Sequence, residues 1–234
     1  MKYFYIYVFI LSCIIIFVSY FNTLMMPIKE SFDSLHKLTF ILLGDSILQN
    51  NNYVPTRSSI EYLFTNNTNN INNTNNKIVF LAMDDSKIND VYNQIKKIPA
   101  NVNTKLTTIF ISVGGNDILS YFTDNIDMDN FSYLHILFLQ YTNLIFNIHN
   151  KLPNAKIVLF NLYYPPTNAY KKYESIINKW NNMLYNYAKE NDYSLLNISD
   201  ILVTPNDFSF EIEPSTSGGK KIVDAIMSNY YFDK

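Results

Sequence analysis

Two patterns of apolar and polar positions alternate along the chain beyond residue 37. Runs of apolar and β-branched residues, typical of buried parallel strands, cover residues 38–43, 77–82, 107–113, 155–162 and 193–198. The amphipathic stretches between them predict helices over 56–64, 87–97, 129–151, 168–190 and 216–230. Strands that alternate with helices in this way predict an α/β fold, in which helices cover both faces of a five-stranded parallel sheet.

Residues 65–76 interrupt this alternation with the sequence TNNTNNINNTNN. A tract of asparagine and threonine with one apolar residue cannot bury enough surface to offset the entropy lost on ordering. It is therefore predicted to be a flexible surface loop.

The N-terminal segment differs from the rest of the chain, because residues 3–28 contain no charged side chain. As a helix, residues 3–21 would span roughly 28 Å, close to the hydrocarbon thickness of a bilayer. This predicts a single-pass transmembrane anchor within residues 1–26, a connector over 27–37 and one domain over 38–234. The alternative is a cleaved signal peptide of a secreted protein. The apolar run is long for such a peptide and lacks a small-x-small cleavage site.

Charge and cysteine content exclude several classes of function. The net charge is −2 and no basic stripe is present, so a nucleic-acid partner is not expected. The only cysteine is Cys13, within the first apolar segment. The domain therefore has no disulfide, no thiolate metal ligand and no thiol nucleophile.

Two short motifs follow predicted strands and carry candidate chemistry. Gly44-Asp45-Ser46 comes after strand 38–43, and Gly114-Gly115-Asn116-Asp117 comes after strand 107–113. In open α/β sheets the carboxyl ends of the strands form the ligand-binding edge. A serine nucleophile and an asparagine amide that can stabilise an oxyanion should therefore lie together. Taken singly, each motif is equally well explained as a cap or a turn.

With these two blocks, the chain resembles the SGNH (GDSL-type) hydrolases over about residues 38–230. It is similar to a branch that also carries Ile212-Glu213-Pro214-Ser215, followed here by Gly218-Gly219. The resemblance implies a three-layer α/β/α sandwich of the flavodoxin-like type. It also implies hydrolysis of acyl or acetyl esters without a metal or an organic cofactor.

The resemblance assigns roles residue by residue. Ser46 matches the nucleophile, and its backbone N–H and the Asn116 amide match two oxyanion donors. The third donor is the backbone N–H of a glycine in the family, and that position is Asp85 here. Its carboxylate would lie beside the developing negative charge and raise the barrier. Asp45, Asp85 and Gly115 are predicted to contact the substrate.

The general base is the largest departure from the family. Most members end with Asp-x-x-His, but the matching positions are Phe210 and Glu213. The histidines, His36, His135 and His149, lie outside this block, and the two on helix 129–151 are interpreted as surface or boundary residues. Glu213 is the candidate base. Its alternative role is to pair with an amide at a helix N-terminus.

Asp207 is the nearest acidic residue that could assist Glu213. The sequence as a whole thus predicts an SGNH-type serine hydrolase of a small-molecule ester, either an acyl ester or an acetylated glycan. A catalytically silent protein of the same fold that binds such a ligand is the alternative. A flavodoxin-like small-molecule binder is a third, although the chain has no G-x-x-x-x-G-K phosphate loop.

Overall fold

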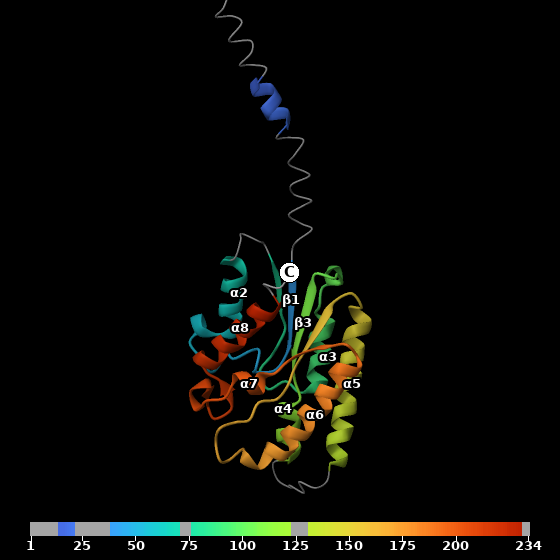
Figure 1. Cartoon of the computed structure of the whole chain (residues 1–234), viewed down its shortest axis with the longest axis vertical. Coiled ribbons are helices and arrows are strands. Elements are labelled where there is room, and N and C mark those ends of the chain that lie inside the picture. Colours follow the sequence, from blue (N-terminus) through green and yellow to red (C-terminus); the bar gives the residue numbers. More distant parts are fainter. Residues whose placement is uncertain (1–13, 22–37, 71–75, 123–130, 231–234) are drawn as a thin grey trace, which may run out of the picture. The chain divides into compact units, whose positions relative to one another are not determined.

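A parallel five-stranded sheet forms the centre of the domain in the computed structural model, which describes residues 14–21, 38–70, 76–122 and 131–230 (Figure 1). The strands are β1 (Thr39–Gly44), β2 (Lys77–Phe80), β3 (Thr107–Ser112), β4 (Lys156–Phe160) and β5 (Ser194–Leu196). Their order is β2-β1-β3-β4-β5, which is the flavodoxin-like order. The predicted α/β class and five parallel strands are confirmed.

Helices cover both faces of this sheet, as predicted. The longer helices are α2 (Ile60–Asn70), α3 (Ile88–Lys96), α4 (Gly115–Phe122), α5 (Ser132–Lys151), α6 (Glu174–Glu190) and α8 (Thr216–Tyr230). Shorter elements are α7 (Ile198–Ile201) and the 3₁₀ helices η1 (Thr56–Ser58), η2 (Ala100–Val102), η3 (Lys171–Tyr173) and η4 (Pro205–Asp207). In Figure 1, α2 and α8 lie on one side of the sheet and α3, α5 and α6 on the other.

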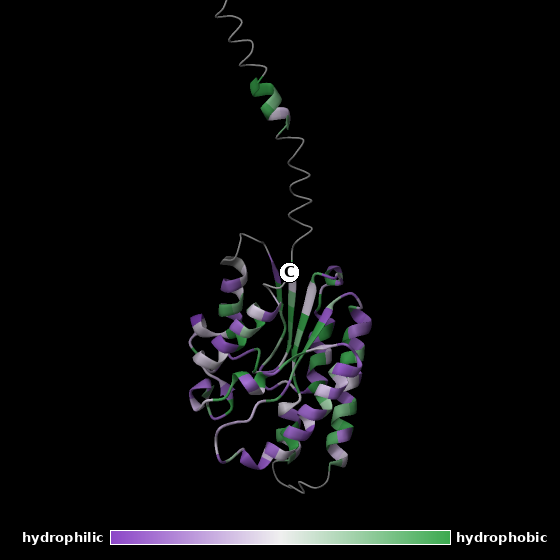
Figure 2. Cartoon of the chain, in the orientation of Figure 1, coloured by the Kyte–Doolittle hydropathy of each residue, from purple (hydrophilic) through white to green (hydrophobic). Residues whose placement is uncertain are grey.

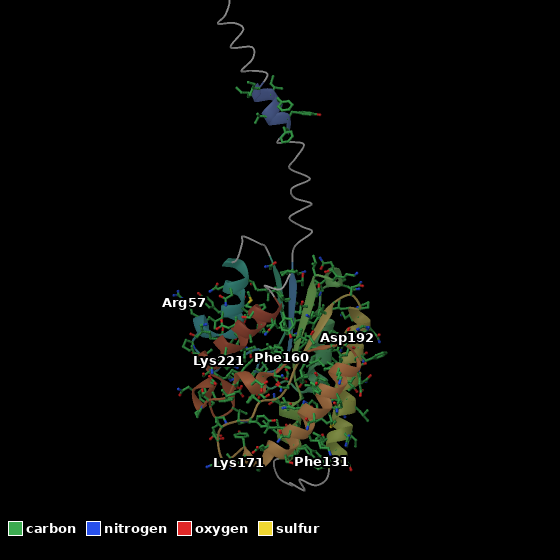
Figure 3. All side chains as sticks on the ribbon, in the orientation of Figure 1. Arg57, Phe131, Phe160, Lys171, Asp192 and Lys221 are labelled. Carbon is green, nitrogen blue, oxygen red and sulfur yellow. The ribbon has the colours of Figure 1, made fainter. Side chains whose placement is uncertain are left out.

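The alternation of side chains along each strand separates the core into two layers. Ile41 and Ile109 face the helices α3, α5 and α6, whereas Phe40 and Phe110 face α2 and α8. Strands that bury both faces have near-continuous apolar sequences, which is why the runs predicted them. Figure 2 shows these strands as largely hydrophobic, and Figure 3 shows Phe160 of β4 among the elements of the core.

Three segments differ from the prediction. Helix α2 continues to Asn70, so the first part of the Asn/Thr tract is helical rather than a loop; residues 71–75 lie outside the described residues. Thr68 supports this extension because its hydroxyl donates to the Phe64 carbonyl at 2.9 Å. Helix α4 and a hairpin of β6 (Phe208–Ser209) and β7 (Glu213–Pro214) were not predicted.

The chain divides into two units, residues 1–37 and residues 38–234. Residues 14–21 form a helix, and the rest of the predicted anchor lies outside the described residues. Among the residues that are described, no helix has both the length and the apolar character needed to cross a bilayer.

Candidate active site

The three predicted catalytic side chains line one hollow at the carboxyl ends of β1 and β3. This is the switch point of the sheet, because β1 pairs with β2 on one side and with β3 on the other. Ser46 follows β1, Asn116 lies in the first turn of α4, and Glu213 lies in β7. The hollow is lined by Asp45, Ser46, Ile47, Gly115, Asn116, Ile118, Leu119, Leu162, Tyr163, Pro165, Tyr170, Tyr173, Ile177, Ile212 and Glu213.

Backbone geometry fixes the turn that presents Ser46. Gly44 has φ +125°, and a Cβ at this position would lie 1.7 Å from the Ser112 carbonyl oxygen. Only glycine fits so close to a neighbouring strand. The next residue, Asp45, donates its N–H to the same carbonyl at 3.0 Å, and its Oδ1 accepts the Ser112 hydroxyl at 2.9 Å and the Ile47 N–H at 3.2 Å.

Gln94 of α3 holds the other side of this turn and was not singled out from the sequence. Its Oε1 accepts the Gly44 N–H and its Nε2 donates to the Gly44 carbonyl, both at 2.8 Å. The same Nε2 also donates to the Ser86 hydroxyl at 3.1 Å. One sequence feature could have identified Gln94: it is a glutamine on the buried face of an amphipathic helix. A buried amide requires hydrogen-bond partners, so such a residue is expected to hold neighbouring groups in place.

Two groups that can donate hydrogen bonds, the Asn116 amide and the Ser46 backbone N–H, belong to residues that line the hollow. The Asn116 amide is oriented by the Ser86 carbonyl, to which its Nδ2 donates at 3.2 Å; a second N–H on this nitrogen stays available. Among the described residues, no acceptor takes the backbone N–H of Ser46. Asp117 stabilises the start of α3, because its carboxylate accepts the Ile88 N–H at 3.1 Å.

Asp85 does not join these donors. It adopts φ +60°, the left-handed conformation that favours glycine, which the family carries at this position. Its backbone N–H donates to Asp84 Oδ1 at 3.0 Å, and Asp85 does not line the hollow. The expected third oxyanion donor is therefore already engaged by a neighbouring carboxylate. Of the three predicted substrate contacts, the structure places Asp45 and Gly115 on the hollow but not Asp85.

The backbone on both sides of Glu213 is anchored. The Tyr163 hydroxyl donates to the carbonyl of Ile212, and the Asn50 amide donates to the carbonyl of Pro214 at 3.0 Å. Asn50 also accepts the Ile60 N–H at 2.9 Å, which joins the segment after Ser46 to the start of α2. These contacts fix β7, which carries Glu213, next to the segment that carries Ser46. No local feature of the sequence indicated these contacts of Asn50 and Tyr163.

The environment of Glu213 raises its pKa to about 6. Burial is the largest cause, since the side chain is 9% exposed, and the charges of Asp84 and Asp85 add to it; hydrogen bonding with Ser46 opposes it. Carboxylate Oε2 is buried and has no well-formed hydrogen bond among the described residues. Ser46 and Glu213 line the same hollow, and the Ser46 hydroxyl is one of the groups that influence the pKa of Glu213.

Asp45 is a second buried acid at the hollow, and its pKa is raised to about 7. Burial is the main cause, and the negative charge of Glu213 raises the pKa further, whereas hydrogen bonds from Ser112 and Ile47 lower it. By accepting these two hydrogen bonds, Asp45 stabilises the turn that carries Ser46.

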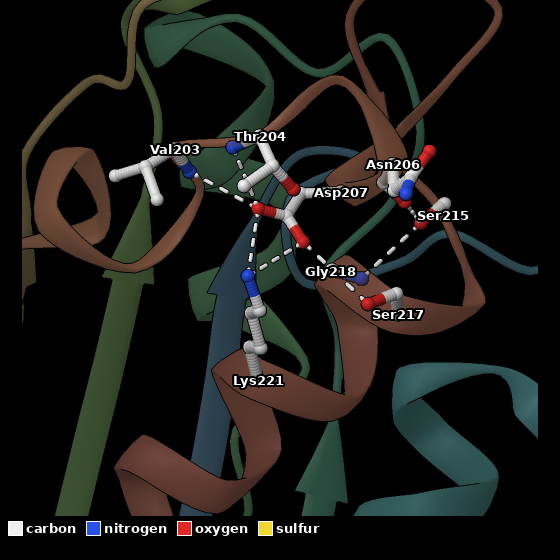
Figure 4. Close-up of polar contacts among 8 residues, drawn as sticks. All are labelled: Val203, Thr204, Asn206, Asp207, Ser215, Ser217, Gly218 and Lys221. Atoms are coloured by element: carbon white, nitrogen blue, oxygen red, sulfur yellow. Dashed lines mark hydrogen bonds and ion pairs between the residues drawn. The ribbon is translucent and has the colours of Figure 1, made fainter.

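Asp207 has a different role from the one considered in the sequence. Its carboxylate pairs with Lys221 at 2.8 Å and accepts the N–H groups of Val203 and Thr204 at 3.1 and 2.9 Å (Figure 4). Burial raises its pKa, but these contacts outweigh burial, and the net shift is downward. Asp207 therefore anchors the segment before the hairpin to α8 and does not assist Glu213.

The two histidines among the described residues do not line the hollow. His135 and His149 are exposed on α5, as predicted, and His36 lies outside the described residues. Within the described ranges, no three His, Cys, Asp or Glu side chains gather as a group that could hold a metal ion.

Comparison with known proteins finds one matching family and several solved structures with a similar fold. The model of the GDSL-like lipase/acylhydrolase family matches residues 42–218. No curated protein matches the sequence. Among solved structures, a member of the lipolytic protein G-D-S-L family from Veillonella parvula is 15% identical, with a TM-score of 0.62, and the match covers 83% of this chain and 99% of that chain.

Two further structures share the fold. An esterase, EstA, from a Pseudoalteromonas species is 16% identical with a TM-score of 0.58, over 81% of this chain and 94% of its own. An acetyl xylan esterase from Geobacillus stearothermophilus is 13% identical with a TM-score of 0.60, over 82% and 93%. At these identities the structural likeness establishes the fold.

Proposed function

Because the chain belongs to the GDSL-like lipase/acylhydrolase family, we propose that it is a serine hydrolase of carboxylic esters in which Ser46, Asn116 and Glu213 carry the reaction. The observation that supports this assignment is the convergence of the three side chains, from segments far apart in sequence, on one hollow. Proteins that share its fold include an esterase and an acetyl xylan esterase, consistent with a small-molecule ester substrate.

The reaction follows from the positions of these groups. Ser46 Oγ attacks the ester carbonyl carbon while the Glu213 carboxylate takes the hydroxyl proton. The Ser46 N–H and the Asn116 amide stabilise the oxyanion. The proton passes from Glu213 to the departing alcohol, leaving an acyl group on Ser46. Water then attacks this acyl-enzyme while Glu213 accepts its proton. Glu213 returns that proton to Ser46 Oγ as the acyl–oxygen bond breaks, which releases the acid product and restores the Ser46 hydroxyl and the Glu213 carboxylate.

A carboxylate can act as the base here because its environment makes it more basic. A free glutamate is about two pKa units less basic than imidazole, or roughly 3 kcal/mol of proton affinity. Burial brings the pKa of Glu213 to about 6 and closes most of that difference. The oxygen Oε2, which has no well-formed partner among the described residues, is a suitable proton acceptor.

The Asn116 amide provides one test of this proposal. Asn116→Ala removes one oxyanion donor and is expected to lower kcat about 10²- to 10³-fold while changing KM little, because the bond forms mainly in the transition state. The measurement is steady-state hydrolysis of p-nitrophenyl esters. Asn143→Ala, at an exposed position of α5, is the matched control and should retain full activity. Equal rates for the two variants would contradict the role of Asn116.

One observation favours a second candidate, a protein that binds an ester ligand without turning it over. The backbone N–H expected as the third oxyanion donor, that of Asp85, is bonded to Asp84. Binding of an ester to the wild-type protein without any hydrolysis would support this candidate. Hydrolysis that is lost on Ser46→Ala would eliminate it.

We also propose that residues 1–26 anchor the protein in a membrane. The support is the absence of charged side chains between residues 3 and 28. The full chain with a C-terminal tag should sediment with membranes and resist carbonate extraction, whereas a version that begins at residue 38 should not. A soluble product whose N-terminus has been cleaved would contradict the anchor and indicate a signal peptide.

A further inference from the structure

The hairpin that carries Glu213 has little stability of its own. Its strands, β6 and β7, are two residues long and are joined by two residue pairs. A hairpin of this size is not stable by itself in water. Its turn adds backbone strain, because Phe210 and Glu211 have φ of +46° and +72°. The position of the Glu213 carboxylate therefore depends on contacts from outside the hairpin.

Tyr163, which follows β4, contacts both strands of this hairpin. Its ring packs against the ring of Phe208 in β6, with the two centroids 5.1 Å apart. Its hydroxyl donates to the carbonyl of Ile212, the residue directly before Glu213. Tyr163 also lines the hollow that contains Ser46 and Glu213. One side chain thus connects the carboxyl end of β4 to the backbone that carries the proposed base.

The carboxylate of Glu213 is not held by a dedicated acid. Asp207, the nearest candidate, pairs with Lys221, and Oε2 of Glu213 has no hydrogen-bond partner among the described residues. We therefore propose that Tyr163 is the positioning residue of the base. By holding the Ile212 carbonyl, it keeps the Glu213 carboxylate buried in the hollow beside Ser46. The proposal rests on the ester-hydrolase function.

A tyrosine hydroxyl suits this role because it stays a donor over the whole working range of pH. Burial raises the pKa of Tyr163 well above its usual value, and the negative charges of Glu213 and Asp45 raise it further. The hydroxyl is therefore protonated whether Glu213 is charged or neutral. The bond to Ile212 persists while the base accepts and returns its proton.

Two adjacent tyrosines allow a matched test of this contact. Tyr163→Phe keeps the ring that packs on Phe208 and lines the hollow, and it removes only the hydroxyl that donates to Ile212. The Tyr164 hydroxyl donates instead to Asn178 Oδ1 at 2.5 Å, in α6, and Tyr164 does not line the hollow. Tyr164→Phe is therefore the control for loss of a tyrosine hydroxyl from the same loop.

The kinetic experiment measures hydrolysis of p-nitrophenyl esters as a function of pH. Tyr163→Phe should lower kcat about 10- to 100-fold, because a base that is no longer held in place is misaligned, and should change KM less than about twofold, because the ring stays. Its acidic limb should move to lower pH, since a more hydrated Glu213 has a pKa closer to its usual value. Tyr164→Phe should behave as the wild type.

Combination with Glu213→Gln shows whether Tyr163 acts through the base. In the Glu213→Gln protein, adding Tyr163→Phe should lower kcat less than about twofold, because the positioning of an absent base has no further effect. If the two losses multiply instead, Tyr163 acts on the reaction by itself and the proposal is wrong. The same holds if Tyr163→Phe and Tyr164→Phe have equal kcat and equal pH profiles.

An NMR titration separates this proposal from the proposed function. The carboxylate carbons of glutamate are labelled with ¹³C, and the signal of Glu213 is the one that Glu213→Gln lacks. Its midpoint should be about 6 in the wild type and in Tyr164→Phe, and at least about 0.5 lower in Tyr163→Phe. That fall supports the positioning of Glu213 even if the wild-type protein hydrolyses no ester. An unchanged midpoint in Tyr163→Phe overturns the proposal, whatever the activity.

Discussion

Ser46→Ala is expected to lower kcat/KM for ester hydrolysis by about 10⁴-fold or more, the largest effect of any single substitution in the domain. The change removes the only atom proposed to bond to the substrate, and removal of a serine nucleophile leaves only the contribution of binding and oxyanion stabilisation. The fold should be unaffected, because the backbone of the Ser46 turn is held by Gly44, Asp45 and Gln94.

A fluorophosphonate probe gives the direct measurement for Ser46. Intact-mass and peptide mass spectrometry should find one adduct per wild-type chain, located on Ser46, and none on the Ser46→Ala protein. Ser228→Ala, an exposed serine of α8, is the matched control and should label as the wild type does. An adduct on another serine, or esterase activity that survives in Ser46→Ala, would contradict the nucleophile assignment.

Glu213→Gln should lower kcat about 10³-fold and abolish the acidic limb of the pH–rate profile. Only the ionised carboxylate can accept the Ser46 proton, so wild-type kcat/KM should fall about tenfold per pH unit below pH 6, where Glu213 becomes protonated. Glutamine has nearly the same shape but cannot act as a base. Glu211→Gln, an exposed carboxylate in the same hairpin, should behave as the wild type.

The same substitution should stabilise the protein at high pH. Because the folded state raises the pKa of Glu213, it binds this proton more tightly than the unfolded chain. Its contribution to stability therefore declines as the pH rises from about 4.5 to about 6. Glu213→Gln removes this penalty and should raise the free energy of unfolding at pH 8 by about 1 kcal/mol, after a discount for solvent screening. Urea unfolding at pH 8 and pH 4.5 measures the difference. A variant that is less stable than the wild type at pH 8 would contradict the proposed burial of charge.

The sheet was predictable from the sequence because its strands bury both faces. Each apolar run between residues 38 and 198 corresponds to a strand, and each amphipathic stretch between them corresponds to helix over most of its length. The order of the strands could be predicted only from the resemblance to a flavodoxin-like fold, because the apolar runs do not show which strands pair. Helix α4 escaped prediction because its first turn, Gly115-Asn116-Asp117, has the composition of a loop.

The hairpin that carries Glu213 could not be predicted from local sequence. Its strands are two residues long, and its turn places Phe210 and Glu211 at φ +46° and +72°, where glycine or asparagine is usual. Phe210, at the family's aspartate position, is 74% exposed and cannot orient a base. The anchors of this hairpin, Tyr163 and Asn50, lie about 50 and 160 residues away, and such contacts have no signal in a single sequence.

The role of Asp85 could be predicted only in part from the sequence. The sequence predicted that the carboxylate of Asp85, which stands in place of the family glycine, would weaken the oxyanion site. In the structure the Asp85 backbone N–H donates to Asp84 Oδ1, a contact that the sequence did not indicate. Asp84 is itself held by the Tyr53 hydroxyl at 2.8 Å, so this arrangement is fixed by a neighbour from another segment.

The central claim is that Ser46 and Glu213 act as one unit, and a double-mutant cycle tests it most directly. We predict that kcat/KM of the Ser46→Ala/Glu213→Gln protein equals that of Ser46→Ala within about twofold, because a base without its nucleophile has nothing to activate. If the two losses multiply instead, so that the double variant is about 10³-fold slower than Ser46→Ala, the two residues act independently and the proposed reaction centre is wrong.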